Sequence, residues 1–105
     1  LTASGDHTAR IYEVSSGKEL QVLSGHTDEV RSAFFSNNGK LILTYSSDTT
    51  ARIWDAVKGK ELQVLRGHND HLTSAVFSQD GKKILTASRD NTANICIKST
   101  YFNLL

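Results

Sequence analysis

The sequence predicts an all-β chain of consecutive four-stranded antiparallel sheets, because it repeats every 42 residues and the repeats contain hairpin signals. Residues 1–42 and 43–84 share 25 identical positions without a gap, where unrelated sequences would share roughly two or three. A third copy begins at residue 85 and keeps seven of its first thirteen positions. A period of this length is typical of stacked structural units. We therefore expect about two and a half such units in the 105 residues.

Each unit carries the signals of an antiparallel meander. The pairs Asn38-Gly39 and Asp80-Gly81 favour type I′ turns, which need a positive φ at both central residues. Segments rich in β-branched, aromatic and aliphatic residues flank these pairs and predict strands: residues 30–36, 41–46, 72–78 and 83–88. Third strands are expected at residues 9–12, 51–54 and 93–97, and fourth strands at 19–23 and 61–65. The sequence leaves open whether residues 101–105 form a further fourth strand.

Both faces of the predicted sheets carry apolar side chains. In the strand that begins at Val30, strict alternation puts Ala33 and Phe35 on one face and Val30, Ser32 and Phe34 on the other. Such a sheet needs a neighbour on each side. A face-to-face stack of small sheets around an axis meets this need.

Composition excludes several classes of protein and partner. Twelve basic and eleven acidic residues alternate along the chain and give a net charge of +1, so we expect no nucleic-acid partner. The apolar runs are far shorter than a membrane span needs, and no membrane association is expected. Cys96 is the single cysteine, which argues against a disulfide framework and favours a reducing compartment, the cytoplasm. The chain starts at Leu1 and contains no Met, so we expect it to be part of a longer protein.

A specific motif recurs within this period. The middle unit contains Gly25-His26, then a hairpin, then Ser46-Ser47-Asp48-Thr49-Thr50 and finally Ile53-Trp54-Asp55. This order resembles the WD-repeat β-propeller family, over essentially all of residues 1–97. The resemblance implies a partial β-propeller, incomplete and open-ended. Residues 1–23 would be the last three strands of a first blade, 24–65 a complete middle blade and 66–105 a third blade with an atypical end.

The resemblance also implies a structural site. In that family a histidine, a strand hydroxyl, a turn aspartate and the tryptophan form a hydrogen-bonded tetrad. A buried carboxylate is costly unless donors surround it, and these groups supply donors. Carried over by position, the structural tetrad is His26, Thr44, Asp48 and Trp54, with Ser46 as an alternative hydroxyl, and a second partial tetrad is His68, Thr86 and Asp90. Cys96 stands where the middle unit has its tryptophan, which predicts a looser third blade.

Partner contacts are expected where the copies differ while the framework repeats. The residue before the turn aspartate and the opening of the first strand change chemistry from one unit to the next. The resemblance places these positions around a narrow face where peptides and partner proteins dock. The candidate partner-binding residues are Glu29, Arg31, Ser47, His71, Thr73 and Arg89. Surface drift without function is the alternative interpretation of the same differences.

The sequence therefore favours a non-enzymatic protein-protein interaction scaffold that binds a protein or peptide, with no catalytic residue, cofactor or metal. The alternative is a sensory or targeting module attached to a kinase or NTPase outside these residues. A hydrolase built on Ser46, and a metal site at His68, Asp70 and His71, are disfavoured because Ser46 lacks a nucleophile-elbow sequence and the tetrad already uses His68. Open blade edges predict either further propeller blades or self-association.

Overall fold

The computed structural model of the chain describes residues 1–66 and 68–97. This part contains strands and no helix, and therefore no helix that could cross a membrane. The all-β prediction is confirmed. The strands are β1 (Thr2–Ala3), β2 (Thr8–Tyr12), β3 (Glu19–Ser24), β4 (Val30–Phe35), β5 (Leu41–Ser46), β6 (Ala51–Asp55), β7 (Glu61–Leu65), β8 (Leu72–Phe77), β9 (Lys83–Ser88) and β10 (Ala93–Ile97).

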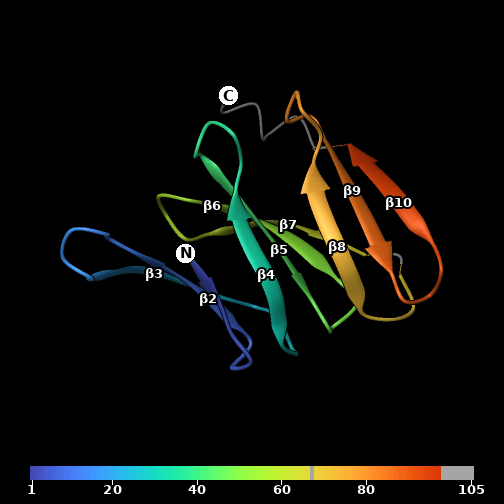
Figure 1. Cartoon of the computed structure of the whole chain (residues 1–105), viewed down its shortest axis with the longest axis horizontal. Coiled ribbons are helices and arrows are strands. Elements are labelled where there is room, and N and C mark those ends of the chain that lie inside the picture. Colours follow the sequence, from blue (N-terminus) through green and yellow to red (C-terminus); the bar gives the residue numbers. More distant parts are fainter. Residues whose placement is uncertain (67, 98–105) are drawn as a thin grey trace.

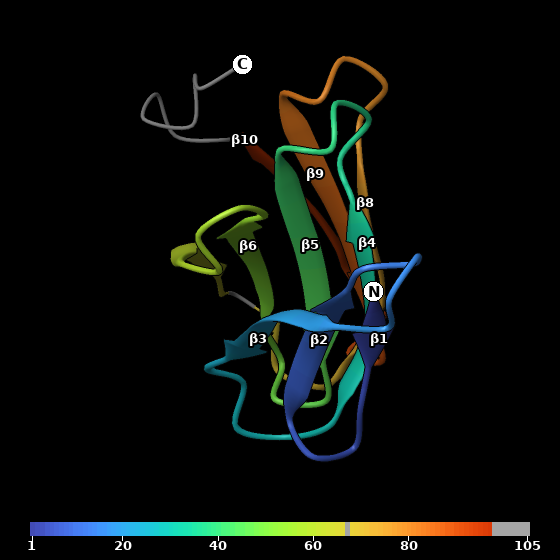
Figure 2. The same ribbon diagram turned by 90° about the vertical axis from the view of Figure 1, so that its left-hand side faces the viewer.

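The strands form three antiparallel sheets that follow one another in chain order (Figure 1). The first has the order β1-β2-β3, the middle one β4-β5-β6-β7, and the third β10-β9-β8. Viewed from the side, the first sheet lies in front of the other two (Figure 2). The sheets are open and consistent with part of a propeller. Residues 101–105, where a fourth strand of the third sheet was considered, lie outside the described residues.

The hairpin turns differ from the predicted type. Gly39 has a φ of 73° and Asn38 does not have a positive φ, so the type I′ prediction is wrong. The Gly39 N–H donates to the Ser36 carbonyl at 2.9 Å, and the Ser36 N–H donates to the Leu41 carbonyl at 2.8 Å. The loop is thus four residues long, and loops of this length are built around a type I turn. Gly81 repeats the same arrangement in the third sheet.

Apolar clusters cover both faces of the middle sheet. On one face, Leu43 and Ile53 pack in a cluster with Leu72, Ala75 and Ile84 of the third sheet. On the opposite face, Ile42 and Trp54 share a cluster with residues of the first sheet, namely Ala9, Ile11 and Leu23. The middle sheet is therefore held between its two neighbours, and its core is continuous with theirs.

A β-bulge alters the predicted alternation in β4. Val30 pairs with Ser46 and Ser32 pairs with Tyr45, so Arg31 is an extra residue in the ladder. An extra residue shifts all side chains before it to the other face. Val30 consequently joins Ala33 in the cluster toward the first sheet, while Phe34 packs toward the third. The prediction that Val30 shares a face with Phe34 is wrong for this reason.

The outer faces of the first and third sheets are exposed. Leu85 occupies the position of Leu43 in the repeat and is 46% exposed, whereas Leu43 is fully buried. Val76 and Tyr12 are also exposed to 44% and 38%. These side chains occupy positions that are covered in the middle sheet.

Candidate functional site

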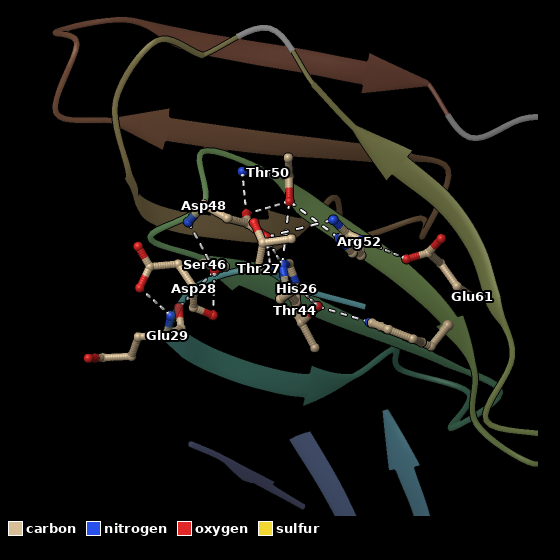
Figure 3. A network of polar contacts seen from close by, with 11 residues as sticks. His26, Thr27, Asp28, Glu29, Thr44, Ser46, Asp48, Thr50, Arg52 and Glu61 are labelled. Atoms are coloured by element: carbon tan, nitrogen blue, oxygen red, sulfur yellow. Dashed lines mark hydrogen bonds and ion pairs between the residues drawn. The ribbon is translucent and has the colours of Figure 1, made fainter. Parts of the chain in front are cut away.

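Four side chains from four separate segments meet beside the middle sheet, and Figure 3 labels three of them, His26, Thr44 and Asp48. His26 lies between β3 and β4, Thr44 on β5, Asp48 in the β5–β6 turn and Trp54 on β6. The His26 Nδ1 lies 2.7 Å from Asp48 Oδ2, and its Nε2 lies 2.7 Å from Thr44 Oγ1. The Trp54 indole N–H donates to the same Thr44 oxygen at 2.9 Å. The structure thus brings together the four residues of the expected tetrad.

Burial favours the neutral form of His26 in this network. The side chain of His26 is fully buried and that of Asp48 is 3% exposed. Burial lowers the pKa of His26, although the hydrogen bond and the charge of Asp48 oppose this effect. A neutral imidazole that donates from Nδ1 to the carboxylate can accept the Thr44 hydroxyl proton at Nε2. Each polar group of this hydrogen-bonded network then has a partner, so the network rigidifies the middle sheet.

Asp48 is the centre of the network. Its Oδ2 also accepts the Thr27 N–H at 3.1 Å, and its Oδ1 accepts the N–H and hydroxyl of Thr50 at 2.9 and 2.6 Å. Burial raises the pKa of Asp48, but the hydrogen bonds from Thr50 and His26 outweigh it and lower the pKa to about 2. The aspartate therefore stays ionised and ties the loop before β4 to the β5–β6 turn.

Arg52 and Glu61 extend the network and were missed by the sequence analysis. The Arg52 Nη2 lies 3.7 Å from Asp48 Oδ2, and its Nη1 donates to Glu61 Oε1 at 2.6 Å. A Cβ on Gly25 would come within 3.0 Å of both partners of this pair, so a larger residue there would push against the ion pair. The repeat contained a signal for the pair, because Arg10 and Glu19 occupy the same positions and also pair, at 2.8 Å.

Ser46 has a structural position. Its hydroxyl donates to the Glu29 carbonyl at 2.8 Å and accepts the Asp48 N–H at 3.0 Å. Both ring nitrogens of His26 are already bonded to Thr44 and Asp48, so the imidazole is not positioned as a base for Ser46. Of the two hydroxyls considered from the sequence, Thr44 is the one that contacts the imidazole.

The third sheet repeats most of this geometry. His68 Nδ1 lies 3.0 Å from Asp90 Oδ2, and its Nε2 lies 2.8 Å from Thr86 Oγ1. Hydrogen bonds, first among them that of the Thr92 hydroxyl, hold the pKa of Asp90 well below its usual range. Cys96 pairs with Ile84 in the same register as Trp54 with Ile42. The looser third blade stays a prediction.

Hydrogen exchange tests this difference. The amides of β10 are expected to exchange faster than those of β6, because cysteine is a much poorer donor than an indole N–H. Native-state exchange followed by NMR measures both strands at once. A Cys96→Trp variant is the control, since it restores the indole and should slow exchange in β10. Equal protection of the two strands, or no response to this variant, contradicts the prediction.

The network also predicts a pH dependence of stability. The pKa of His26 lies below 6.5 in the folded chain, so the unfolded chain takes up this proton first as the pH falls. The contribution of neutral His26 to the free energy of unfolding is complete above pH 6.5. Below pH 6.5 it declines by at most about 1.4 kcal/mol per pH unit. The contribution of Asp48 is lost between its ordinary pKa of 3.8 and about 2. Urea denaturation across this range measures both effects.

A His26→Gln variant isolates the contribution of the histidine. Glutamine cannot take up a proton, so the decline just below pH 6.5 should be shallower than in the unsubstituted chain. If both proteins lose stability with the same slope in this range, His26 is not the titrating group.

The six candidate partner-binding residues lie at the end of the sheets that carries the His-Asp-Thr networks, which we call the network end. We call these six residues the network rim. The β-bulges leave Arg31 and Thr73 as the extra residues of β4 and β8, and both side chains are exposed. Arg31 Nη1 donates to Ser47 Oγ at 3.4 Å. In the third sheet, Arg89 Nη1 lies 3.1 Å from His71 Nε2. Backbone hydrogen bonds from Ser47 to Glu29 and from Arg89 to His71 join the strand openings to the turns.

The residues of the disfavoured metal site lie apart in the structure. His68 belongs to the buried network, while His71 is partly exposed and its Nδ1 lies 3.3 Å from Asp70 Oδ1. Within the described part of the chain, no three histidine, cysteine, aspartate or glutamate side chains are grouped for a metal ion. The two histidines thus have different environments.

Tandem antiparallel sheets, of which the middle and third are each tied by a buried His-Asp-Thr network, define a repeat protein of the β-propeller class. The family model of the WD domain, G-beta repeat (WD40) matches residues 17–55 and again residues 59–96. These matches cover more than half of the chain, so it belongs to the WD40 repeat family and the resemblance seen in the sequence is confirmed. WD40 repeat domains are in general non-catalytic scaffolds, and the repeats of this chain imply a domain of the protein-interaction kind.

A curated relative shares part of this region. The chain is 46% identical over 39 residues to the nuclear distribution protein PAC1-2 of Postia placenta. The match covers 37% of this chain and 9% of that protein. The similarity is thus limited to about one repeat.

Proposed function

We propose that the network rim docks a protein or peptide partner on a rigid, non-catalytic scaffold. The observation that carries this proposal is the contrast between framework and surface. Asp48 and Asp90 hold equivalent turns with equivalent bonds, while the bulge residues above them are Arg31 in one copy and Thr73 in the next. A constant frame with variable exposed side chains is what selective recognition needs.

The rim is organised before any partner arrives. Ser46 and Ser88 bond to backbone carbonyls of the loops that open β4 and β8, which holds the rim residues in place. A surface that is already ordered loses little conformational entropy on binding. The side chains of Arg31 and Arg89 remain exposed and offer planar guanidinium donors, which suit carboxylate and carbonyl groups of a peptide.

A peptide-display selection against the chain tests this function. Arg31→Ala and Arg89→Ala are expected to weaken the selected peptides by about 1 kcal/mol or more each, measured by fluorescence anisotropy. Arg66→Ala is the matched control, because Arg66 is an exposed arginine near the same end and outside the rim. Unchanged affinity in both rim variants would show that the rim differences are surface drift.

The exposed outer faces form a separate part of the proposal. Side chains such as Val76 and Leu85 are available to further propeller blades or to a second copy of the chain.

We also place the protein in a reducing compartment such as the cytoplasm, because Cys96 has no second cysteine in the sequence with which to form a disulfide.

A further inference from the structure

The fold separates charges that alternate along the sequence. The strands run between two ends of the sheets: the network end and the end formed by the turns β2–β3, β4–β5, β6–β7 and β8–β9, which we call the turn end. Six lysines lie at the turn end: Lys18, Lys40, Lys58, Lys60, Lys82 and Lys83. The arginines outside strand ion pairs, namely Arg31, Arg66 and Arg89, lie at the network end with six aspartate or glutamate residues. A net charge of +1 therefore conceals a basic end and an acidic end.

The carboxylates at the turn end already have partners. Glu19 and Glu61, which begin β3 and β7 there, pair with Arg10 and Arg52 at 2.8 and 2.6 Å. Glu13 Oε1 accepts the Ser16 hydroxyl at 2.8 Å. Asp55 Oδ1 accepts the N–H groups of Val57 and Lys58 at 2.9 Å each, and Asp80 Oδ1 accepts the Lys82 N–H at 2.9 Å. The side chains of the six lysines are exposed. Asp55 and Asp80 thus bind the backbone of their own turns, and in the β4–β5 turn the Asn38 side chain accepts the Lys40 N–H in the same way at 2.9 Å.

The turns of the three sheets form one continuous surface. The Gln21 amide of the first sheet donates to the Val57 carbonyl at 2.9 Å, and the Asn37 amide donates to the Gln79 carbonyl of the third sheet at 3.4 Å. The turns β4–β5 and β8–β9 lie side by side in Figure 1. The Ala56 N–H also donates to the Lys40 carbonyl at 3.1 Å. The turn residues of the middle sheet are therefore joined directly to both neighbouring sheets.

A groove in this surface supplies a second, independent feature. It has a volume of about 330 Å³ and is lined by Lys40, Leu41, Asp55, Val57 and Lys58. Val57 is 79% exposed and supplies apolar surface beside the lysines. The groove thus combines an apolar wall with a lysine on each side, and its size is that of a pocket for one or two side chains.

We propose that the turn end binds an acidic protein segment, in which an apolar side chain enters the groove and flanking carboxylates contact the lysines. Lysines are flexible point charges that attract carboxylates without demanding one geometry. The apolar wall of the groove favours a peptide, which can place an apolar side chain between its carboxylates, over a lipid headgroup, which is polar throughout. This surface lies about 20 Å from the network rim, the length of one strand, and shares no residue with it.

The experiment uses the 105-residue chain and a fluorescein-labelled peptide in which single leucines are separated by pairs of glutamates. Fluorescence anisotropy at low salt measures its affinity. Lys58→Gln is expected to weaken binding about threefold to fivefold, the usual worth of one exposed charge pair. Arg66→Gln is the matched control, because it removes one positive charge from an exposed side chain at the other end, and it should leave the affinity unchanged. Val57→Ser should weaken binding without changing its salt dependence.

Three results would overturn the proposal. Equal weakening by Arg66→Gln would mean that the peptide responds only to net charge. Equal affinity for a peptide with glutamine in place of glutamate would exclude carboxylate recognition. Binding to vesicles of phosphatidylcholine and phosphatidylserine that depends on Lys58, without binding of the acidic peptide, would identify a membrane surface instead. Because Lys58 lies outside the network rim, failure here leaves the function proposed for the rim unaffected.

Discussion

Replacing Asp48 with alanine is expected to lower the free energy of unfolding by about 3–5 kcal/mol, the usual cost of breaking a buried ion-paired or charge-assisted contact. The substitution removes the acceptor for His26 and for the backbone of Thr27 and Thr50. These donors cannot recover hydration because the side chains of His26 and Asp48 are almost completely buried. Urea denaturation followed by tryptophan fluorescence measures the loss, since Trp54 is the single tryptophan.

The internal repeat provides a matched control for this substitution. Asp6 occupies the position of Asp48 in the first copy and also accepts the N–H of the threonine two residues later. Its side chain is 51% exposed, and the described residues before it contain no histidine to pair with it. Asp6→Ala should therefore cost far less than Asp48→Ala. Similar losses at the two positions would mean that the turn, rather than the buried network, is the source of the stability.

The sequence predicted the framework well because periodicity reports on backbone pairing. The expected strand from Leu41 to Ser46 and that from Glu61 to Leu65 have the observed bounds. The tetrad followed from a resemblance carried by His26 and Trp54, not from spacing alone, since residues 28 positions apart meet only after the sheet has formed.

Side-chain direction was less predictable. Alternation assumes a constant register, but Arg31 and Thr73 are inserted into the ladder by β-bulges. The residue after each turn aspartate also adopts a left-handed backbone, with φ values of 73°, 74° and 68° at His7, Thr49 and Asn91. No residue type shared by these three positions indicates this conformation. It results from the aspartate accepting the N–H two residues later, which closes the turn tightly.

Charge separation could not be read from the sequence either. Lysines and carboxylates alternate along the chain, and only the antiparallel meander brings the lysines of successive turns to one end. The first copy contains Lys18 at the position of Lys60, so the repeat places equivalent lysines on successive sheets. Charge averaged along the sequence therefore underestimates the electrostatic potential at one end of a repeat protein.

Replacing Trp54 with alanine is the second substitution with a large expected effect. The indole is 1% exposed and packs with Val30, Ile42 and residues of the first sheet. Truncating a buried aromatic residue of this size costs about 3–5 kcal/mol, a large fraction of the about 5–15 kcal/mol by which domains are stable. Trp54→Phe keeps an aromatic ring in the core and removes the hydrogen bond to Thr44 together with part of the indole volume, so its loss should fall well below that of Trp54→Ala. Urea denaturation followed by circular dichroism measures both variants.

Tyr12→Ala is the control, because Tyr12 has the position of Trp54 in the first copy but lies on an outer face and is 38% exposed. In dilute solution the free energy of unfolding is expected to fall only slightly, since Tyr12 buries little apolar surface within the single chain. If the loss grows with protein concentration, a second copy covers the outer face, because an association that buries Tyr12 stabilises the folded state by mass action. A loss as large as that of Trp54→Ala at every concentration contradicts the prediction, since it would require Tyr12 to be buried within the single chain.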